Sequence, residues 1–124
     1  MNIENRTATP GLAECLSAFV RSVNTHPTIA RLLKGWEPLI AIEATDDGQR
    51  FHLRVRDCRL AEVGAGEADA EHTVLMRGEQ AVLVEVFSGA LNPARAYLEG
   101  RLEVFGSDRD QIKLDAISLV LWGM

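Results

Sequence analysis

The stretch from Asn92 to Ser107, NPARAYLEGRLEVFGS, constrains the fold most, because it holds three structural signals in sixteen residues. Asn92-Pro93 predicts a helix start, since Asn accepts hydrogen bonds from free N–H groups and Pro suits the first helical turn. Gly100 predicts the end of that helix, because glycine adopts positive φ angles without a Cβ clash. Residues 101–105 alternate polar and apolar side chains, which is typical of a half-buried strand. Gly106-Ser107 ends the strand and Ser107 can cap another helix, so the stretch predicts a helix, a strand and a helix with almost no slack.

Composition limits the classes of protein to consider. A chain of 124 residues fits one domain of ordinary size. The net charge of −5 argues against nucleic acid as the main partner, because phosphate binding needs a cationic surface. No apolar run approaches the roughly 20 residues that cross a bilayer, and residues 1–10 lack the basic start and apolar core of a secretory signal. Cys15 and Cys58 form no CxxC motif, so we expect a cytoplasmic protein with free thiols. We also expect residues 1–8 to be a flexible N-terminus.

Two helices are predicted in the first third of the chain. Thr9-Pro10 is a helix-start signal, and the apolar residues after it recur at helical spacing. This stripe consists of Leu12, Cys15, Leu16, Phe19, Val20 and Val23. Pro27 starts a second, shorter helix that ends at Gly35, and Trp36 is expected to fill the gap between this helix and a sheet.

A section of strands follows. Residues 39–45 form a buried strand, and Asp46-Asp47-Gly48 predicts a tight turn into a strand with Phe51, Leu53 and Val55 on one face. The other face carries His52, Arg54 and Arg56, which we interpret as a solvated face; an anion site, or a face covered by a partner or a lipid headgroup, stays open. Two more strands are predicted over residues 58–63 and 71–76, with a flexible turn over residues 64–69.

The rest of the chain is rich in apolar helix. Residues 79–87 are apolar around most of the helix surface, which indicates burial on several sides or the lining of an apolar space. The last helix runs from Ser107 or Asp108 to about Leu121, and residues 116–124 are almost wholly apolar. Such an end must pack on the core, on a second copy of the chain or against a lipid-like ligand.

Catalytic motifs are missing from the sequence. His26, His52 and His72 lack the spacing of a metal site, and His52 and His72 would meet only if their strands were neighbours. There is no nucleophile elbow and no phosphate-binding loop. We therefore predict that the protein is not an enzyme and has no catalytic residue, metal site or cofactor.

The order of these elements resembles the sterol carrier protein 2 family. That family's signature is Gly, Asn/Asp-Pro, a helix, Gly-Lys/Arg, an alternating strand and Gly-Asp/Ser. The corresponding positions are Gly89, Asn92-Pro93, Ala96-Tyr97, Gly100-Arg101, Leu102, Val104, Gly106 and Ser107. The resemblance covers roughly residues 10–121. The short turns, and the absence of a peroxisomal address at Trp122-Gly123-Met124, are typical of a bacterial member.

The resemblance implies an α/β (α+β) fold over residues 9–124: a five-stranded mixed sheet covered by about five helices, with an apolar tunnel between them. The tunnel of such proteins takes fatty acids, acyl-CoA, sterol-like molecules or quinones. The resemblance also implies which residues bind the ligand: Val82, Val86, Phe87, Tyr97, Leu98, Leu102, Val104, Ile117, Val120 and Leu121. Phe105 and Leu119 are further candidates, and Arg54, Arg56 or Tyr97 is expected to hold the headgroup. Because the strand alternates, we expect Leu102 and Val104 to face the helices and Phe105 the opposite face.

Two functions are expected, the first from the resemblance and the second from the apolar end of the chain. The first is a non-catalytic lipid-binding or carrier domain that needs no cofactor. The alternative is an accessory or scaffold protein whose apolar C-terminal helix forms a homodimer or docks on an enzyme of lipid or ubiquinone biosynthesis.

Overall fold

The computed structural model describes residues 11–66 and 71–123. The predicted flexible stretch over residues 1–8 and the helix-start signal Thr9-Pro10 lie outside the described residues. The helices are α2 (Leu12–Asn24), α3 (Pro27–Leu32), α4 (Gln80–Ser88), α5 (Pro93–Leu98) and α6 (Asp108–Trp122). The strands are β1 (Leu39–Ala44), β2 (Arg50–Arg56), β3 (Arg59–Ala65), β4 (Val74–Gly78) and β5 (Leu102–Phe105).

The five strands form one sheet in the order β3-β2-β1-β4-β5. β1 pairs with β4 in parallel, and the other three neighbouring pairs are antiparallel. The predicted five-stranded mixed sheet is therefore confirmed. The order also makes β5 an edge strand, next to β4 alone.

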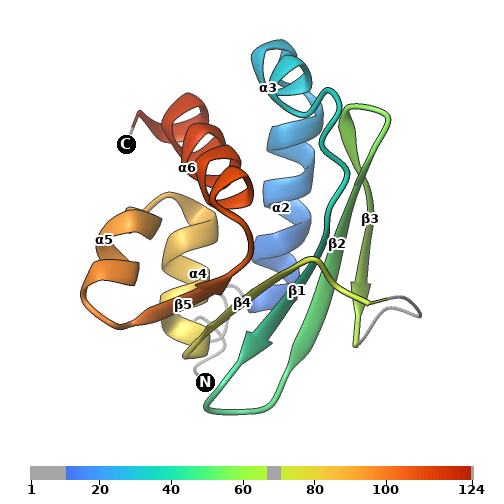
Figure 1. Cartoon of the computed structure of the whole chain (residues 1–124). Coiled ribbons are helices and arrows are strands. Elements are labelled where there is room, and N and C mark those ends of the chain that lie inside the picture. The colour runs from blue at the N-terminus through green and yellow to red at the C-terminus, as the bar shows by residue number, and fades with distance from the viewer. Residues whose placement is uncertain (1–10, 67–70, 124) are drawn as a thin grey trace, which may run out of the picture.

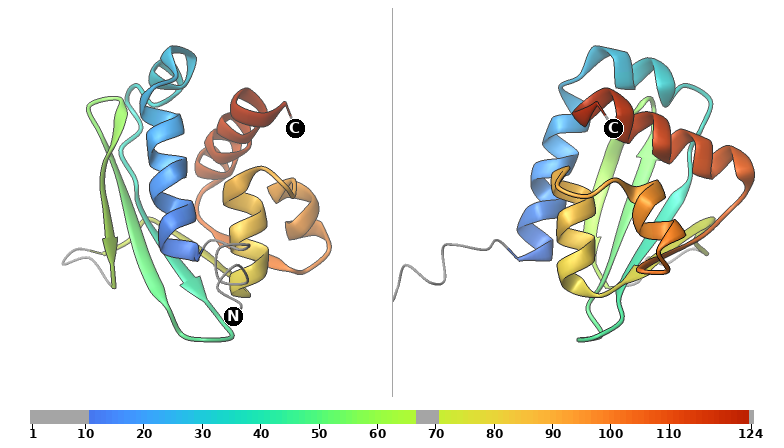
Figure 2. Two further views of the ribbon diagram at one scale, coloured as in Figure 1. Left: turned by 180° about the vertical axis from the view of Figure 1, so that it is seen from behind. Right: turned by 90° about the vertical axis from the view of Figure 1, so that its left-hand side faces the viewer.

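The helices gather on one face of the sheet, so the molecule has two layers (Figure 1). The view from behind shows the sheet on one side and the helices on the other (Figure 2). Alternate strand residues point into the space between the layers, among them Ile40, Ile42, Leu53, Val55 and Met76, which are all buried. In the described part of the chain no helix is long and apolar enough to cross a membrane.

Helix α2 supplies the largest share of the core. Its buried residues are Leu12, Cys15, Leu16, Phe19 and Val23, which follow the predicted stripe. These side chains pack α2 against the sheet and α4. The Cys15 thiol donates a hydrogen bond to the Val84 carbonyl at 3.5 Å. Burial raises the pKa of the Cys15 thiol, which agrees with a packing role.

Two predicted boundaries in the sheet were wrong. The stretch predicted as a turn from residue 64 is strand as far as Ala65, because Gly64 pairs with His52 and Ala65 with Phe51. Gly64 suits this position because a Cβ there would lie 2.5 Å from Cε1 of the His52 ring. β4 begins at Val74 rather than at residue 71, since its ladder with β1 starts at the pair Ile40–Val74.

The stretch from Asn92 to Ser107 folds as predicted. Asn92 Oδ1 accepts a hydrogen bond from the Ala94 N–H at 2.8 Å and so caps α5. Gly100 ends the turn after α5 with a φ of 75°. Ser107 caps α6 by accepting from the Asp110 N–H at 3.1 Å, and the Asp110 carboxylate accepts from the Ser107 N–H at 2.9 Å. β5 is thus fixed at both ends by capped helices.

Helix α6 is anchored along its length. Near its start the Trp36 indole N–H donates to Asp110 Oδ1 at 2.8 Å. One turn later Lys113 Nζ donates to the Leu32 carbonyl at 2.6 Å. At its end the Trp122 ring lies against Gly89, where a Cβ would come within 2.6 Å of the ring. These contacts hold α6 against α3 and the end of α4.

Candidate functional site

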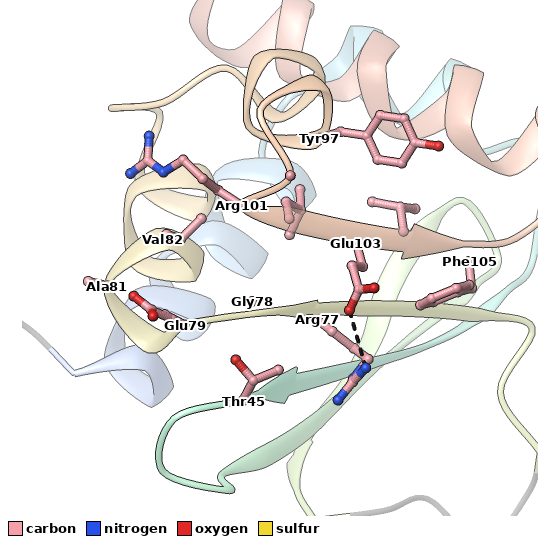
Figure 3. A pocket seen from close by; sticks show the side chains of 13 residues that line it. Thr45, Arg77, Gly78, Glu79, Ala81, Val82, Tyr97, Arg101, Glu103 and Phe105 are labelled. Atoms are coloured by element: carbon pink, nitrogen blue, oxygen red, sulfur yellow. Dashed lines mark hydrogen bonds and ion pairs between the residues drawn. The ribbon is translucent and has the colours of Figure 1, made fainter.

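The edge of the sheet at β5 carries a half-open cavity of about 790 Å³. We call it the outer cavity. Figure 3 shows it between β5, the end of β4 and the helices α4 and α5. It is lined by Thr45, Arg77, Gly78, Glu79, Ala81, Val82, Tyr97, Gly100, Arg101, Leu102, Glu103, Val104 and Phe105. Its volume falls in the range of about 300–1,000 Å³ that is usual for small-molecule sites.

Small residues and a short helix leave this space open. Gly78, Ala81 and Gly100 line the outer cavity, and none of them has a side chain larger than a methyl group. Helix α5, which covers β5, has six residues and only Ala96 of them is buried. A short helix with one small buried residue cannot fill the space over the sheet edge as α2 does over β1 to β3.

Two smaller cavities adjoin the outer cavity in turn, since each shares lining residues with the one before it. The middle cavity, of about 70 Å³, is lined by Met76, Pro93, Ala94, Tyr97, Val104, Gln111, Leu114 and Asp115. The core void, of about 20 Å³, is lined by Phe19, Val23, Leu33, Trp36, Ile40, Leu53, Val55, Leu60, Met76, Phe87, Leu114 and Ile117. Tyr97 and Val104 line both the outer and the middle cavity, and Met76 and Leu114 line both the middle cavity and the core void. The three spaces therefore follow one another from the sheet edge to the core.

The alternation of β5 decides what faces this path. Leu102 and Val104 point towards the helices, as the sequence predicts, and pair with Gly78 and Met76 of β4. Glu103 and Phe105 lie on the other side of the strand, while Tyr97 reaches from α5 over its helix-facing side (Figure 3). The inner face of the site is therefore apolar and its rim is polar.

The arginines at the rim are held by carboxylates. Arg77 donates to Glu43 Oε1 at 2.6 Å and to Glu103 Oε1 at 3.2 Å. Arg101 lies 3.4 Å from both Glu85 Oε1 and Glu99 Oε1. The hydrogen bond from Arg77 lowers the pKa of Glu43, and the same bond raises the pKa of Arg77.

The Asp115 carboxyl group lies in different surroundings from the carboxylates at the rim. This carboxylate lines the middle cavity. Burial raises the pKa of Asp115, since its charged form is poorly solvated there. The pKa of Glu99 is lowered, first by its hydrogen bond with Arg95. The middle cavity therefore solvates a carboxylate less well than water does.

The structure brings together six of the ten predicted ligand-binding residues along this path. Val82, Tyr97, Leu102 and Val104 line the outer cavity. Phe87 and Ile117 line the core void. The other four, Val86, Leu98, Val120 and Leu121, line none of the three cavities.

These four residues differ in their surroundings. Val86 is buried in the core, and Val120 and Leu121 pack against it while partly exposed. Leu98 is 82% exposed. Of the two further candidates, Phe105 lines the rim, and Leu119 lines a surface groove beside α5 that shares Ala94 and Asp115 with the middle cavity. The apolar end of α6 is thus mostly packed on the chain's own core.

The arginines expected at the headgroup lie elsewhere. Arg54 and Arg56 alternate with the buried residues Leu53 and Val55, so they are on the face of the sheet that the helices leave uncovered. They line none of the three cavities, so their role in holding a headgroup stays a prediction. Tyr97 alone of the three candidates lines it.

Sequence reasoning missed several lining residues. Thr45, Arg77, Glu79 and Glu103 belong to the rim, and Met76 and Leu114 join the inner cavities. Arg77 carried no local signal, because its place at the rim depends on the pairing of β4 with β5. Arg101 did carry one, since it is part of the Gly100-Arg101 signature.

Metal ligands do not gather in the described part of the chain, where no group of three or more His, Cys, Asp or Glu side chains could hold an ion. β1 lies between β2 and β4 in the sheet, so the strand of His52 is not next to the strand that follows His72. The site offers apolar walls and a polar rim, which suits binding of a molecule with an apolar tail.

Comparison with known proteins gives two findings. The model of the SCP-2 sterol transfer family matches residues 19–114. No curated protein matches the chain significantly.

Solved structures share the fold at low identity. A crystal structure of sterol carrier protein 2 has a TM-score of 0.64 at 21% identity, with 86% of each chain covered. A palmitated SCP2L2 from Aedes aegypti has a TM-score of 0.66 at 13% identity, covering 88% of this chain and 95% of that one. A ubiquinone synthesis protein, UbiJ-SCP2, has a TM-score of 0.63 at 14% identity, with 85% of each chain covered.

Proposed function

Because the chain belongs to the SCP-2 sterol transfer family, we propose that it is a non-catalytic carrier that holds the apolar tail of a lipid. The tail lies between β5 and the helices α4, α5 and α6, with its polar end at the rim of the outer cavity. Among the solved structures of this fold one is described as palmitated, which supports a ligand with an acyl tail.

One observation carries the proposal: the outer cavity, the middle cavity and the core void share lining residues in succession. Tyr97 and Val104 form the first junction, and Met76 and Leu114 form the second. The lining of the core void is wholly apolar, so a water molecule there would have no hydrogen-bond partners. A tail that advances along this path must push side chains apart, and it replaces empty space by dispersion contacts.

The energetics predict a dependence on chain length. Each CH₂ group removed from water contributes about 0.8 kcal/mol, or roughly a fourfold gain in affinity. We expect the dissociation constants of a series of alkyl glycerol esters to fall by about this factor per CH₂ until the path is full. Longer tails should then bring no further gain.

The test is titration calorimetry with that series, together with mass spectrometry of lipids extracted from the purified protein. Trp36 lines the core void, so long tails should shift tryptophan emission in the natural protein but much less in Trp36→Phe. Protein that carries no lipid and ignores every chain length would overturn the proposal. An affinity that does not depend on chain length would place the ligand outside this path.

An accessory or scaffold role remains the second candidate, favoured by two exposed residues on α6. Ile112 is 67% exposed and Leu119 is 57% exposed, and seven residues apart they lie on one side of the helix. A homodimer or a partner enzyme of lipid or quinone metabolism would cover this side. Sedimentation of Ile112→Lys/Leu119→Lys should then show a smaller species than the natural protein, while lipid affinity stays the same.

The proposed carrier needs no cofactor and catalyses no reaction. The proposal also includes a cytoplasmic location, which agrees with the free thiols of Cys15 and Cys58. Incubation with an acyl ester, followed by chromatography of the products, should return the ester intact. Turnover that stays with the purified protein would contradict the carrier role.

A further inference from the structure

We propose that the outer cavity selects lipids with an uncharged polar headgroup, such as an alcohol or a glycerol ester, over lipids with an anionic headgroup. This inference rests on the proposed carrier function and narrows its ligand class. It follows from how the polar groups at the rim are already paired.

The cationic side chains that line the outer cavity already form ion pairs with carboxylates. Two arginines line it, and each contacts two glutamates. Arg77 binds Glu43 and Glu103, and Arg101 lies beside Glu85 and Glu99. An anionic headgroup would have to compete with these carboxylates for each guanidinium, and the displaced carboxylate would remain near it.

The N-terminus of α4, next to the cavity, is already paired with a carboxylate as well. Helix N-termini attract anions, because their first N–H groups lack partners within the helix. Here the Gln80 N–H, the first of α4, donates to Asp46 Oδ1 at 2.9 Å. A carboxylate of the chain itself therefore occupies the place that a phosphate would take.

The polar side chains that remain at the rim suit a neutral partner. Within the described residues, the hydroxyls of Thr45 and Tyr97 and the carboxylate of Glu79 make no side-chain hydrogen bond or ion pair, although all three line the outer cavity. A hydroxyl both donates and accepts, so it matches an alcohol or an ester carbonyl. The Glu79 carboxylate accepts from a hydroxyl and repels an anion.

The size of the discrimination follows from this arrangement. An anion at the rim meets the like charge of Glu79, which has no ion-pair partner among the described residues, whereas Glu103 is paired with Arg77. The site is half open to solvent. At an effective dielectric constant between that of water and that of a protein surface, this repulsion corresponds to roughly a tenfold loss of affinity or more. The difference should shrink as added salt screens the charges.

A matched pair of ligands tests the inference. We would titrate the protein with 1-lauroylglycerol and with 1-lauroylglycerol 3-phosphate, which differ only in the phosphate, at low ionic strength. Binding of the glycerol ester that is at least about tenfold tighter supports uncharged selectivity. Equal or tighter binding of the phosphate overturns the inference and leaves the carrier function standing, whereas binding of neither ligand overturns both.

Variants locate the cause at the rim. Glu79→Gln/Glu103→Gln should narrow the difference in affinity to about threefold or less, chiefly by tightening the phosphate, since a glutamine oxygen still accepts from the glycerol hydroxyl. The control Asp57→Asn/Glu71→Gln makes the same change of charge at residues that do not line the outer cavity, and it should leave the difference unchanged. If the control narrows the difference as much, the net charge of the chain is responsible and the rim is not. Thermal unfolding of both variants checks that each is folded.

Discussion

The two halves of this sheet are covered in different ways. Over β1, β2 and β3, the thirteen residues of α2 bury five side chains in one stripe. Over β5, the six residues of α5 bury a single alanine. Of the three cavities, only the core void of about 20 Å³ borders the first half, which we call the filled half. The second, which we call the hollow half, keeps the outer and middle cavities. The difference shows that a site can arise from a helix that is too short to complete the core.

The filled half and the hollow half should respond differently to the same truncation. Leu16 on α2 and Leu102 on β5 are each at most 1% exposed, but Leu102 also lines the outer cavity. We expect Leu16→Ala to lower the free energy of unfolding by about 3–5 kcal/mol, since it creates a closed cavity. Leu102→Ala should cost at least about 1 kcal/mol less, because the space it leaves opens into one that already exists.

Denaturant unfolding measures both costs, and lipid titration separates the halves further. Leu16→Ala should keep its lipid affinity once folded, and Leu102→Ala should change it. Equal costs for the two variants would break the comparison, since Leu102 would then be packed as tightly as Leu16.

Asp110, near the start of α6, forms hydrogen bonds with residues of both halves, so a variant at this position tests how the halves are joined. Hydrogen bonds to Asp110 come from Trp36, which lines the core void, and from Ser107 at the end of β5. Burial alone would raise the pKa of Asp110, but these bonds together lower it. We expect Asp110→Asn to cost about 1 kcal/mol at neutral pH, after solvent screening is allowed for.

The pH dependence of that cost has a definite sign. A lowered pKa in the folded state stabilises it fully above the ordinary value of 3.8, and the contribution is lost as pH falls through the lowered value. The gap in unfolding free energy between the natural protein and Asp110→Asn should therefore narrow below that pH. A gap that widens on acidification would contradict the proposed role of these hydrogen bonds.

The smallest effect is expected on the face of the sheet that no helix covers. Glu43 there joins Arg50 at 2.9 Å and Arg77 at 2.6 Å. Its pKa is lowered, first by the hydrogen bond from Arg77, so the contribution is present above the ordinary value of 4.5 and is lost as pH falls. Glu43→Gln should cost less than about 1 kcal/mol, and high salt should reduce that cost further. A larger loss that salt does not change would mean that this ion pair is part of the core.

Much of the fold could be predicted from the sequence, because local chemistry determined it. The caps at Asn92 and Ser107, the stop at Gly100 and the stripe of α2 each depend on residues a few positions apart. The ends of β3 and β4 were predicted wrongly, because strand ends depend on pairing with a distant strand.

The site could be predicted only in part for the same reason. The inward direction of Leu102 and Val104 follows from alternation within β5. The rim residues Arg77 and Glu79 reach the site because β4 pairs with β5 and leads into α4. Leu98 was expected to bind the ligand, but α5 ends there and its side chain points to solvent.

The central claim is that the lipid enters through the outer and middle cavities of the hollow half, and that its tail advances from there towards the core void. Val104 forms the junction between the outer and middle cavities, and Val20 on α2 is also half-buried against the core but lines none of the three cavities. The most direct test is calorimetric titration of Val104→Phe and Val20→Phe with 1-lauroylglycerol. The account predicts at least about tenfold weaker binding for Val104→Phe, since the ring occupies the space of several CH₂ groups, and less than about a twofold change for Val20→Phe. Natural affinity in Val104→Phe, or an equal loss in both variants, would contradict it.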